Sequence, residues 1–284
     1  MNKQSCGTLY ICATPIGNLG DITLRVLETL QNVDLVACED TRKTLQLLNH
    51  FSIKKPLTSY YEHNKTFKGS YLINRLLNGE NIALVSDAGM PGISDPGFEL
   101  INECLANNIP YTVLPGASAA ATALVLSGLA NERYCFEGFL PRNKKERTAI
   151  LEQLAQEERT MILYEAPHHL NAALQDLANA LSPERPMVAC RELTKRFEEA
   201  VRGTIAEVQA HFEQNEPRGE FVLVISGLAP QDEPKKELPW ALNRLEELLN
   251  ADMREKDAIK QAAAEAALPK REVYNAYMAL KNQK

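Results

Sequence analysis

The chain has 284 residues, of which 45% are hydrophobic and 24% charged, and its formal net charge is −6. This composition is typical of a soluble globular protein, and the length predicts two or three domains rather than one core. The negative charge excludes a uniformly basic nucleic-acid-binding protein, so any RNA partner would have to be held by a local basic patch.

Two further features of the sequence bear on the compartment. No apolar run is long enough for a membrane span, and the N-terminal residues lack the apolar core of a signal peptide. The six cysteines are scattered without a Cys-x-x-Cys pair, which favours free thiols over structural zinc. We therefore expect a protein of the reducing cytoplasm, with no membrane partner and no metal.

The first part of the chain alternates short apolar runs with helical periodicity. Strands are predicted at residues 9–13, 34–38, 57–60, 82–86 and 111–114. Helices are predicted from Asp21, from a cap at Thr41, and at residues 72–77 and 98–105. Apolar strands that alternate with helices indicate a mostly parallel, doubly wound sheet, which we assign to an N-terminal α/β domain of residues 1–115.

A second α/β series follows the Pro115-Gly116 turn and opens with an alanine-rich helix at residues 117–129. Its strands are predicted at residues 135–139, 161–164, 187–191, 199–203 and 221–226. Its other helices are predicted at residues 144–156, 168–180 and 205–212. Residues 191–203 look like two strands joined by a polar turn, so a mixed sheet is expected for a second α/β domain of residues 116–229.

The C-terminal part is predicted to be a small helical domain of residues 236–284. Residues 228–239 are rich in proline and charge and are typical of a linker. Helices are predicted at residues 241–249, 256–267 and 271–279, and the last two form a helix-turn-helix-like pattern. Seven basic and four acidic residues lie between Arg254 and Lys284, so this tail is locally positive, although a solvated three-helix cap is an equally good interpretation.

Three polar loops follow strands of the first sheet. They are residues 14–21, residues 39–42 and residues 86–97, the last of which reads SDAGMPGISDPG. In open α/β sheets ligands bind at the carboxyl ends of the strands, so three such loops favour a site over simple turns. Two corners between a strand and a helix carry further candidate residues. Ser118 could face a ligand, or it could equally be only a helix cap. His168 and His169 are adjacent in the sequence, a spacing that does not suit a metal site.

Four segments together resemble the ribosomal RNA small subunit methyltransferase I family, a branch of the tetrapyrrole-methylase-like S-adenosylmethionine enzymes. The segments are residues 14–23, 39–42, 86–97 and 115–118, and the similarity continues at 137–142, 164–168 and 191–195. The resemblance covers essentially the whole chain. One departure is the first loop, which reads PIGNLGD where tetrapyrrole methylases carry a GxGxGD-like motif. This difference disfavours a tetrapyrrole substrate and fits a loop that meets substrate more than cofactor.

The resemblance implies a fold and an activity. Such enzymes have two α/β domains, bind S-adenosylmethionine in a folded form in the cleft between them, and act as homodimers. The implied reaction is 2′-O-methylation of a cytidine ribose in the decoding region of 16S rRNA, in free rRNA or in the small ribosomal subunit. The residues that we expect to hold the cofactor are Asp87, Gly89, Met90, Pro91, Gly92, Ala117, Ser118, Ala166, Pro167, Gly227 and Leu228.

The acceptor hydroxyl must lose its proton during an in-line displacement, so we expect a carboxylate as general base. Asp40 or Glu39 is the first choice and Asp87 the second. Arg42 would hold a neighbouring phosphate or orient the base, although an Asp40–Arg42 pair could also do no more than fix the loop.

Contacts to RNA are expected from basic residues near the loops: Arg25, Arg42, Lys43, Arg142, Lys144, Lys145, Arg191, Lys195 and Arg196. Two other classes stay open. The chain could methylate a small tetrapyrrole, with the tail as a dimer brace, or it could be a nucleic-acid-binding module without catalysis. The polar loops at the strand ends disfavour the second of these.

Overall fold

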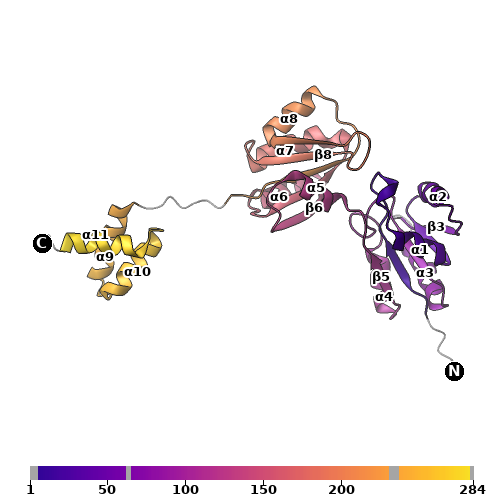
Figure 1. Ribbon diagram of the computed structural model, residues 1–284, viewed down its shortest axis with the longest axis horizontal. Coiled ribbons are helices and arrows are strands. Elements are labelled where there is room, and N and C mark those ends of the chain that lie inside the picture. The colour runs from indigo at the N-terminus through magenta and orange to yellow at the C-terminus, as the bar shows by residue number, and fades with distance from the viewer. Residues whose placement is uncertain (1–5, 62–64, 230–236, 282–284) are drawn as a thin grey trace. The chain divides into compact units, whose positions relative to one another are not determined.

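The computed structural model describes residues 6–61, 65–229 and 237–281. It forms two compact units, one that ends at Leu228 and one that begins at Ala229 (Figure 1). The first unit contains two five-stranded sheets, and the described residues of the second unit form helices but no strand. Both α/β sheets and the helical C-terminal region were predicted from the sequence, and all three are confirmed.

The first sheet is parallel, with strand order β3-β2-β4-β1-β5. Its strands are β1 (Leu9–Cys12), β2 (Leu35–Cys38), β3 (Leu57–Ser59), β4 (Ile82–Val85) and β5 (Tyr111–Leu114). The helices between them are α1 (Leu24–Asn32), α2 (Thr41–His50), α3 (Lys65–Leu77) and α4 (Phe98–Ala106), with a 3₁₀ turn η1 (Leu19–Asp21) before α1. Since all strands run the same way, the loops after β1, β2, β4 and β5 reach the same edge.

Alternating side chains of this sheet pack against different helices, as the period of a strand requires. Leu9, Ile11 and Leu84 share one apolar cluster with residues of α3 and α4. Cys12 and Val85 share the other cluster with residues of α1 and α2. Helices therefore cover both faces, which explains why these strands are almost continuously apolar.

The second sheet is mixed, with strand order β6-β7-β10-β8-β9. Its strands are β6 (Tyr134–Phe139), β7 (Thr160–Glu165), β8 (Pro186–Arg191), β9 (Glu199–Thr204) and β10 (Phe221–Ile225). Its helices are α5 (Ala119–Ser127), α6 (Lys144–Ala155), α7 (Leu170–Leu181) and α8 (Ile205–Gln214), with a 3₁₀ turn η2 (Pro167–His169) before α7. Strand β6 is parallel to β7, whereas β10 is antiparallel to both β7 and β8.

The two faces of the second sheet are covered by different helices. Met161 and Leu223 point to a cluster that includes residues of α6, α7 and α8. Ile162 and Val224, one position along, point to a second cluster with residues of α5. Ile16, from the loop after β1, belongs to that second cluster, so the loop of the first sheet also packs against the second sheet.

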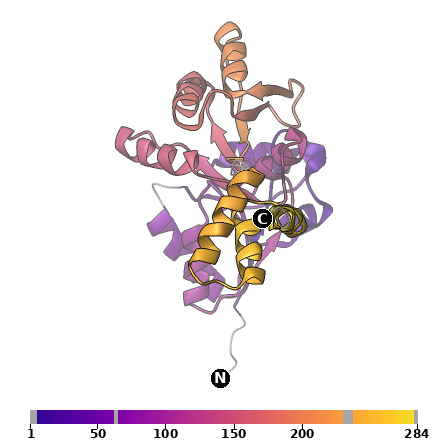
Figure 2. The ribbon, with the colours of Figure 1, turned by 90° about the vertical axis from the view of Figure 1, so that its left-hand side faces the viewer.

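The second unit is a bundle of three helices, α9 (Leu238–Asn250), α10 (Glu255–Glu265) and α11 (Lys270–Lys281) (Figure 2). Leu245, Ile259 and Val273, one from each helix, are fully or almost fully buried in its own apolar core. Leu238 and Pro239 were expected in a linker but belong to the first turn of α9, where proline fits because its missing N–H has no helical partner. Residues 230–236 of that linker lie outside the described residues.

Several predicted boundaries need correction. Asp40, rather than Thr41, caps α2, because its carboxylate accepts a hydrogen bond from the backbone N–H of Arg42. Helix α1 starts at Leu24, after a cap by Thr23, three residues later than the predicted start at Asp21. Helix α3 begins seven residues before the predicted start at Leu72, at Lys65. The predicted domain border at residues 115 and 116 falls inside the first compact unit and stays a prediction.

Candidate active site

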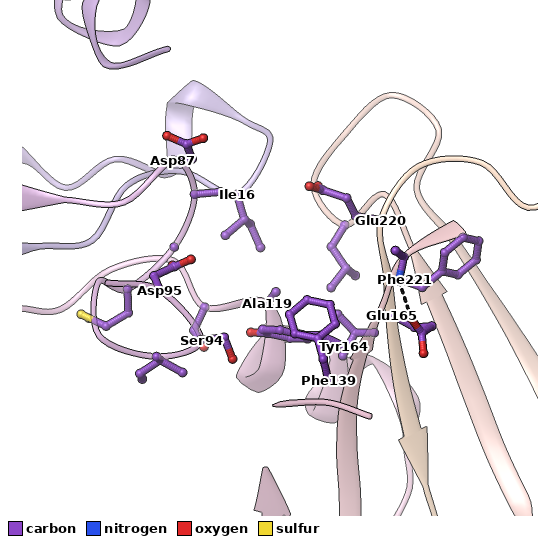
Figure 3. A pocket seen from close by; sticks show the side chains of 18 of the residues that line it. Ile16, Asp87, Ser94, Asp95, Ala119, Phe139, Tyr164, Glu165, Glu220 and Phe221 are labelled. Atoms are coloured by element: carbon purple, nitrogen blue, oxygen red, sulfur yellow. Dashed lines mark hydrogen bonds between the residues drawn. The ribbon is translucent and has the colours of Figure 1, made fainter. Parts of the chain in front are cut away.

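A cavity of about 510 Å³ lies between the polar loops of the first sheet and the second sheet (Figure 3). The first side of the cavity is formed by Ile16, Glu39, Lys43, Asp87, Ala88, Gly89, Met90, Ile93, Ser94 and Asp95. The other side is formed by Ser118, Ala119, Phe139, Tyr164, Glu165, Ala166, Pro167, Leu193, Lys195, Glu220, Phe221 and Val222. Its volume is in the range of cavities that bury a cofactor-sized ligand.

The loop after β4 is fastened to the loop after β1. Thr14 and Gly89 exchange backbone hydrogen bonds of 2.9 and 3.0 Å, and the Thr14 hydroxyl donates to the Ser86 carbonyl at 3.1 Å. Gly89 has a φ of 81°, a conformation that side-chain-bearing residues rarely adopt. Ser94, farther along the same loop, is held at a φ of 61° and lines the cavity. Such backbone conformations outside glycine are concentrated at functional sites.

The Asp87 carboxylate, in the loop after β4, binds two groups that follow β2. Its Oδ1 accepts the backbone N–H of Asp40 at 3.0 Å, and its Oδ2 accepts the Lys43 ammonium at 2.8 Å. The Asp87 side chain is 23% exposed and that of Lys43 is 62% exposed. The loop after β2 and the loop after β4 are therefore joined through one ion pair on the wall of the cavity.

Two other carboxyl groups of the cavity have altered acidity. Burial raises the pKa of Asp95 to about 6, and the negative charge of Glu39 adds to this effect. Burial also raises the pKa of Glu39, with a further contribution from the charge of Asp87. In Figure 3 Asp95 lies across the cavity from the rings of Phe139 and Tyr164.

Asp40 has a different environment from these three carboxylates. It caps α2 and forms a two-point pair with Arg42, at 3.1 Å to Nε and 2.7 Å to Nη2. The hydrogen bonds from Arg42 lower the pKa of Asp40 to about 2. Neither Asp40 nor Arg42 lines the cavity, so the geometry favours the interpretation in which this pair fixes the loop.

The second sheet contributes an aromatic corner. The rings of Phe139 and Tyr164 meet edge to face, with centroids 5.6 Å apart. A register shift between Phe136 and Gly138, where Gly138 has a φ of 65°, alters the course of β6 just before Phe139. Beyond β7 the Glu165 carboxylate accepts the backbone N–H of Ala166 at 2.8 Å, as the dashed line in Figure 3 shows.

Seven of the predicted site residues line this cavity: Glu39, Asp87, Gly89, Met90, Ser118, Ala166 and Pro167. Seven others do not line it: Asp40, Arg42, Pro91, Gly92, Ala117, Gly227 and Leu228. Ser118 also caps α5, with its hydroxyl accepting from the Ala121 N–H at 3.5 Å, so it combines both interpretations that the sequence allowed.

Gly227 and Leu228 lie away from the cavity because of the direction of β10. This strand is antiparallel to β7, so Phe221 pairs with Glu165 at the cavity end and Ile225 pairs with Met161 at the opposite end. Leu228 donates to the Glu157 carbonyl at 2.6 Å, just before β7 begins. Phe221 and Val222, at the start of β10, line the cavity instead.

Asp95 also lines the cavity but was not predicted as a site residue, although it belongs to the polar loop of residues 86–97. Signals for it were present, because an aspartate in a glycine-rich loop after an apolar strand is a functional candidate. Phe139, Tyr164 and Phe221 were also missed, since an aromatic residue at a strand end is most often part of a core.

Among the described residues no group of three histidine, cysteine, aspartate or glutamate side chains could hold a metal ion. The rings of His168 and His169 lie 4.1 Å apart, and neither residue lines the cavity. In the described part of the chain no helix has the length and apolar character needed to cross a membrane.

Known proteins resemble this chain over most of its length. The family model described as Tetrapyrrole (Corrin/Porphyrin) Methylases matches residues 8–209. A relative from Synechocystis sp., named "Ribosomal RNA small subunit methyltransferase I", is 50% identical over 268 residues, which cover 94% of this chain and 96% of that protein. The chain belongs to the ribosomal RNA small subunit methyltransferase I family. It is therefore a methyltransferase, as the resemblance predicted.

Members of the ribosomal RNA small subunit methyltransferase I family differ in length. A relative of that name from Thermotoga maritima is 44% identical over 221 residues, which cover 78% of this chain but 99% of the relative. Among solved structures, uroporphyrin-III C-methyltransferase from Thermus thermophilus in complex with S-adenosyl homocysteine has a TM-score of 0.56 and 16% identity, and the match covers 78% of this chain and 97% of that one. At that identity the likeness shows the fold alone.

Proposed function

We propose that the protein transfers the methyl group of S-adenosylmethionine to the ribose 2′-hydroxyl of a cytidine in the decoding region of 16S rRNA. The observation that carries this proposal is identity of 50% over nearly the whole chain to a relative named as a ribosomal RNA small subunit methyltransferase. The protein would work in the cytoplasm as a homodimer, as the resemblance implies.

The charge of the cavity supports S-adenosylmethionine as its ligand. Five carboxyl side chains line the cavity, Glu39, Asp87, Asp95, Glu165 and Glu220, against two ammonium groups, Lys43 and Lys195. A sulfonium and an α-ammonium group are favoured by such an excess of carboxylates, whereas the phosphates of a dinucleotide are not. A relative of similar fold was solved with S-adenosyl homocysteine, the product of methyl transfer.

The cofactor would lie along the loop after β4, with Gly89 and Met90 offering backbone groups at close range. Ser118 would bind it from the start of α5, and Ala166 and Pro167 would contact the adenosine. Pro91 and Gly92 do not line the cavity and belong to the part of the loop that leads to α4. The sulfonium supplies an activated methyl group, so the protein has to align the acceptor oxygen at about 3 Å from the methyl carbon and remove its proton.

We assign proton removal to a carboxylate that lines the cavity, Glu39 or Asp87, in preference to Asp40. Burial raises the pKa of Glu39, which makes it a better proton acceptor than an ordinary carboxylate. Asp87 is the better placed, because it is held by two hydrogen bonds in a fixed position. The Asp40–Arg42 pair then has an indirect role, because it fixes the loop after β2 that carries Glu39.

Methylation of a tetrapyrrole is the second candidate function, because the matching family model describes tetrapyrrole methylases. An experiment that offers both substrates decides between the two functions. The protein is incubated with S-adenosylmethionine labelled in its methyl group, together with small ribosomal subunits or with a mixture of tetrapyrroles. We expect label in the 16S rRNA, at a cytidine ribose after nuclease digestion. Label in the tetrapyrroles, and none in RNA, would show that the assignment is wrong.

A further inference from the structure

A second cavity, of about 370 Å³, lies beside the first in the same compact unit. The loop after β1 supplies Thr14, Pro15, Gly17 and Leu19, and the loop after β4 supplies Ser86 and Asp87. Helix α2 supplies the third side: Lys43, Thr44, Gln46, Leu47 and His50. We propose that this cavity is a subsite for the acceptor nucleoside, turned out of the RNA.

The helix side of this cavity has a regular pattern. Lys43, Gln46, Leu47 and His50 are spaced at i, i+3, i+4 and i+7, so they form one stripe along α2. At 1.5 Å per residue, the stripe is about 10.5 Å long. The buried face of the same helix is formed by Thr44 and Leu48, which leaves this stripe outside the core.

The chemistry of the stripe suits an unstacked base. Leu47 and, from the opposite loop, Leu19 and Pro15 present apolar surface, on which the face of a base can pack. The Gln46 amide and the His50 ring can donate or accept hydrogen bonds at a base edge. Within the described part of the chain, no hydrogen bond occupies either group.

The second cavity is adjacent to the first, as an acceptor site next to a methyl donor would have to be. Lys43 and Asp87 line both cavities, so their ion pair of 2.8 Å lies on the shared wall. A methyl donor in the first cavity and a nucleoside in the second would meet at this pair. The ribose hydroxyl would then reach the Asp87 carboxylate, which takes its proton as the carbon–sulfur bond breaks and the carbon–oxygen bond forms, with S-adenosyl homocysteine as the leaving product.

A nucleoside can enter a cavity that is enclosed on three sides only after it has left the base stack. Enzymes that modify nucleotides in structured nucleic acid take the target out of the stack into a pocket.

The test uses the full chain, methyl-labelled S-adenosylmethionine and small ribosomal subunits without the methyl group. Two changes address the cavity: the double variant Gln46→Ala/His50→Ala removes the two cavity-lining polar side chains of α2 that have no hydrogen bond to another described residue, and Leu19→Trp fills the cavity. Asn49→Ala is the matched control, because Asn49 is an exposed polar residue of α2 that lines neither cavity. Titration calorimetry measures S-adenosylmethionine binding for each variant, independently of RNA.

We expect each of the two changes to lower kcat/KM for subunits by about tenfold or more, as the loss of two hydrogen bonds or of the space for a base requires. The Kd for S-adenosylmethionine should stay within about twofold of wild type, which separates the second cavity from the first. The control should match wild type in both measurements. If Leu19→Trp disturbs folding, the double variant decides alone.

This inference rests on the proposed function. Labelling of 16S rRNA by the wild-type protein tests the proposed function separately from the nucleoside subsite. Absence of label from 16S rRNA with the wild type overturns both. Label with the wild type, combined with unchanged kcat/KM in the double variant, overturns only the nucleoside subsite. Loss of S-adenosylmethionine binding in the folded double variant overturns it too, because α2 would then serve the cofactor.

Discussion

At the scale of single residues, the carboxylates of the loops beside the cavity are distinguished by their surroundings. Asp40 is held by Arg42, and its pKa is lowered to about 2, whereas Asp95 is half-buried beside Glu39, and its pKa is raised to about 6. Asp87 lies between them and is fixed by Lys43 and a backbone N–H. Four carboxylates in neighbouring loops therefore serve different purposes, because their hydrogen bonds and burial differ.

Asp95 should weaken the unliganded fold at neutral pH. Because its folded pKa of about 6 is above the usual 3.8, the group stabilises the fold below about pH 4, and this contribution is lost as the pH rises through 6. We expect Asp95→Asn to raise the Tm at pH 8 by about 2–4 °C, equivalent to about 1 kcal/mol after allowance for screening by water. Differential scanning fluorimetry without cofactor measures this.

The gain from Asp95→Asn should vanish at pH 4, where the wild-type carboxyl is already protonated. Glu152→Gln, on the exposed face of α6, is the control and should change the Tm little at either pH. An equal gain at pH 4 and pH 8 would mean that the charge of Asp95 is not its cause.

The proton acceptor can be found by comparing three isosteric changes. We expect Glu39→Gln or Asp87→Asn to reduce single-turnover methylation by about 100-fold or more, within the range for loss of a general base. Asp40→Asn should retain most of the activity, because an asparagine can still cap α2. Rapid quench with bound S-adenosylmethionine measures the chemical step directly. Full loss in Asp40→Asn alone would return the assignment to Asp40.

At the scale of elements, the loop after β1 depends on a close approach to the β8–β9 hairpin. A Cβ on Gly17 would lie 2.4 Å from Cγ of Lys195, 2.9 Å from Oγ1 of Thr194 and 3.1 Å from the Leu193 carbonyl oxygen. Lys195 is not free to move, since its ammonium pairs with Glu192 and Glu220 at 2.8 and 2.7 Å. Glycine is thus required here by lack of space.

We expect Gly17→Ala to separate the loop from the hairpin and to weaken S-adenosylmethionine binding several-fold, because the neighbouring Ile16 lines the cofactor cavity. Isothermal titration measures the Kd. Gly20→Ala, in the same loop, is the control, because its new methyl group would meet only the Asn18 side chain. Equal affinities for Gly17→Ala and wild type would show that the loop can adjust.

The sequence was sufficient to predict most of the helices and strands, but not the direction of every strand in the second sheet. Apolar runs such as Ile82–Val85 were recognisable because parallel strands buried on both faces have few polar residues. Strand β10 is equally apolar, and its pattern contains nothing that tells parallel from antiparallel. The resemblance implied that Gly227 lies beside Ala166 and Pro167, but the structure places it beyond the opposite end of β10. The cap of α2 was misplaced by one residue because Asp40 and Thr41 are both good capping residues.

At the scale of the whole molecule, the three-helix unit has its own core and the two-sheet unit contains both cavities. The Thermotoga maritima relative matches only 78% of this chain while almost all of the relative is covered, so a shorter chain carries the family name. The helical unit has five basic residues without an ion pair in the described part of the chain: Arg254, Lys256, Lys260, Lys270 and Arg271.

We expect a chain that ends at Leu228 to keep its S-adenosylmethionine affinity and to lose RNA affinity. Removal of several phosphate contacts should raise the KM for small ribosomal subunits about tenfold and flatten its dependence on salt concentration. Methylation assays at a series of salt concentrations measure both effects. An unchanged KM and salt slope would favour the interpretation of the helical unit as a solvated cap.

The place of β10 in the second sheet has a consequence for how the chain is made. This strand lies between β7 and β8, yet it is the last strand of the sheet to leave the ribosome. Until it arrives, two apolar edges are open, and such edges invite pairing with other chains. Folding of the second half must therefore wait for residue 225, and a fragment cut at 209, where the family match ends, should aggregate.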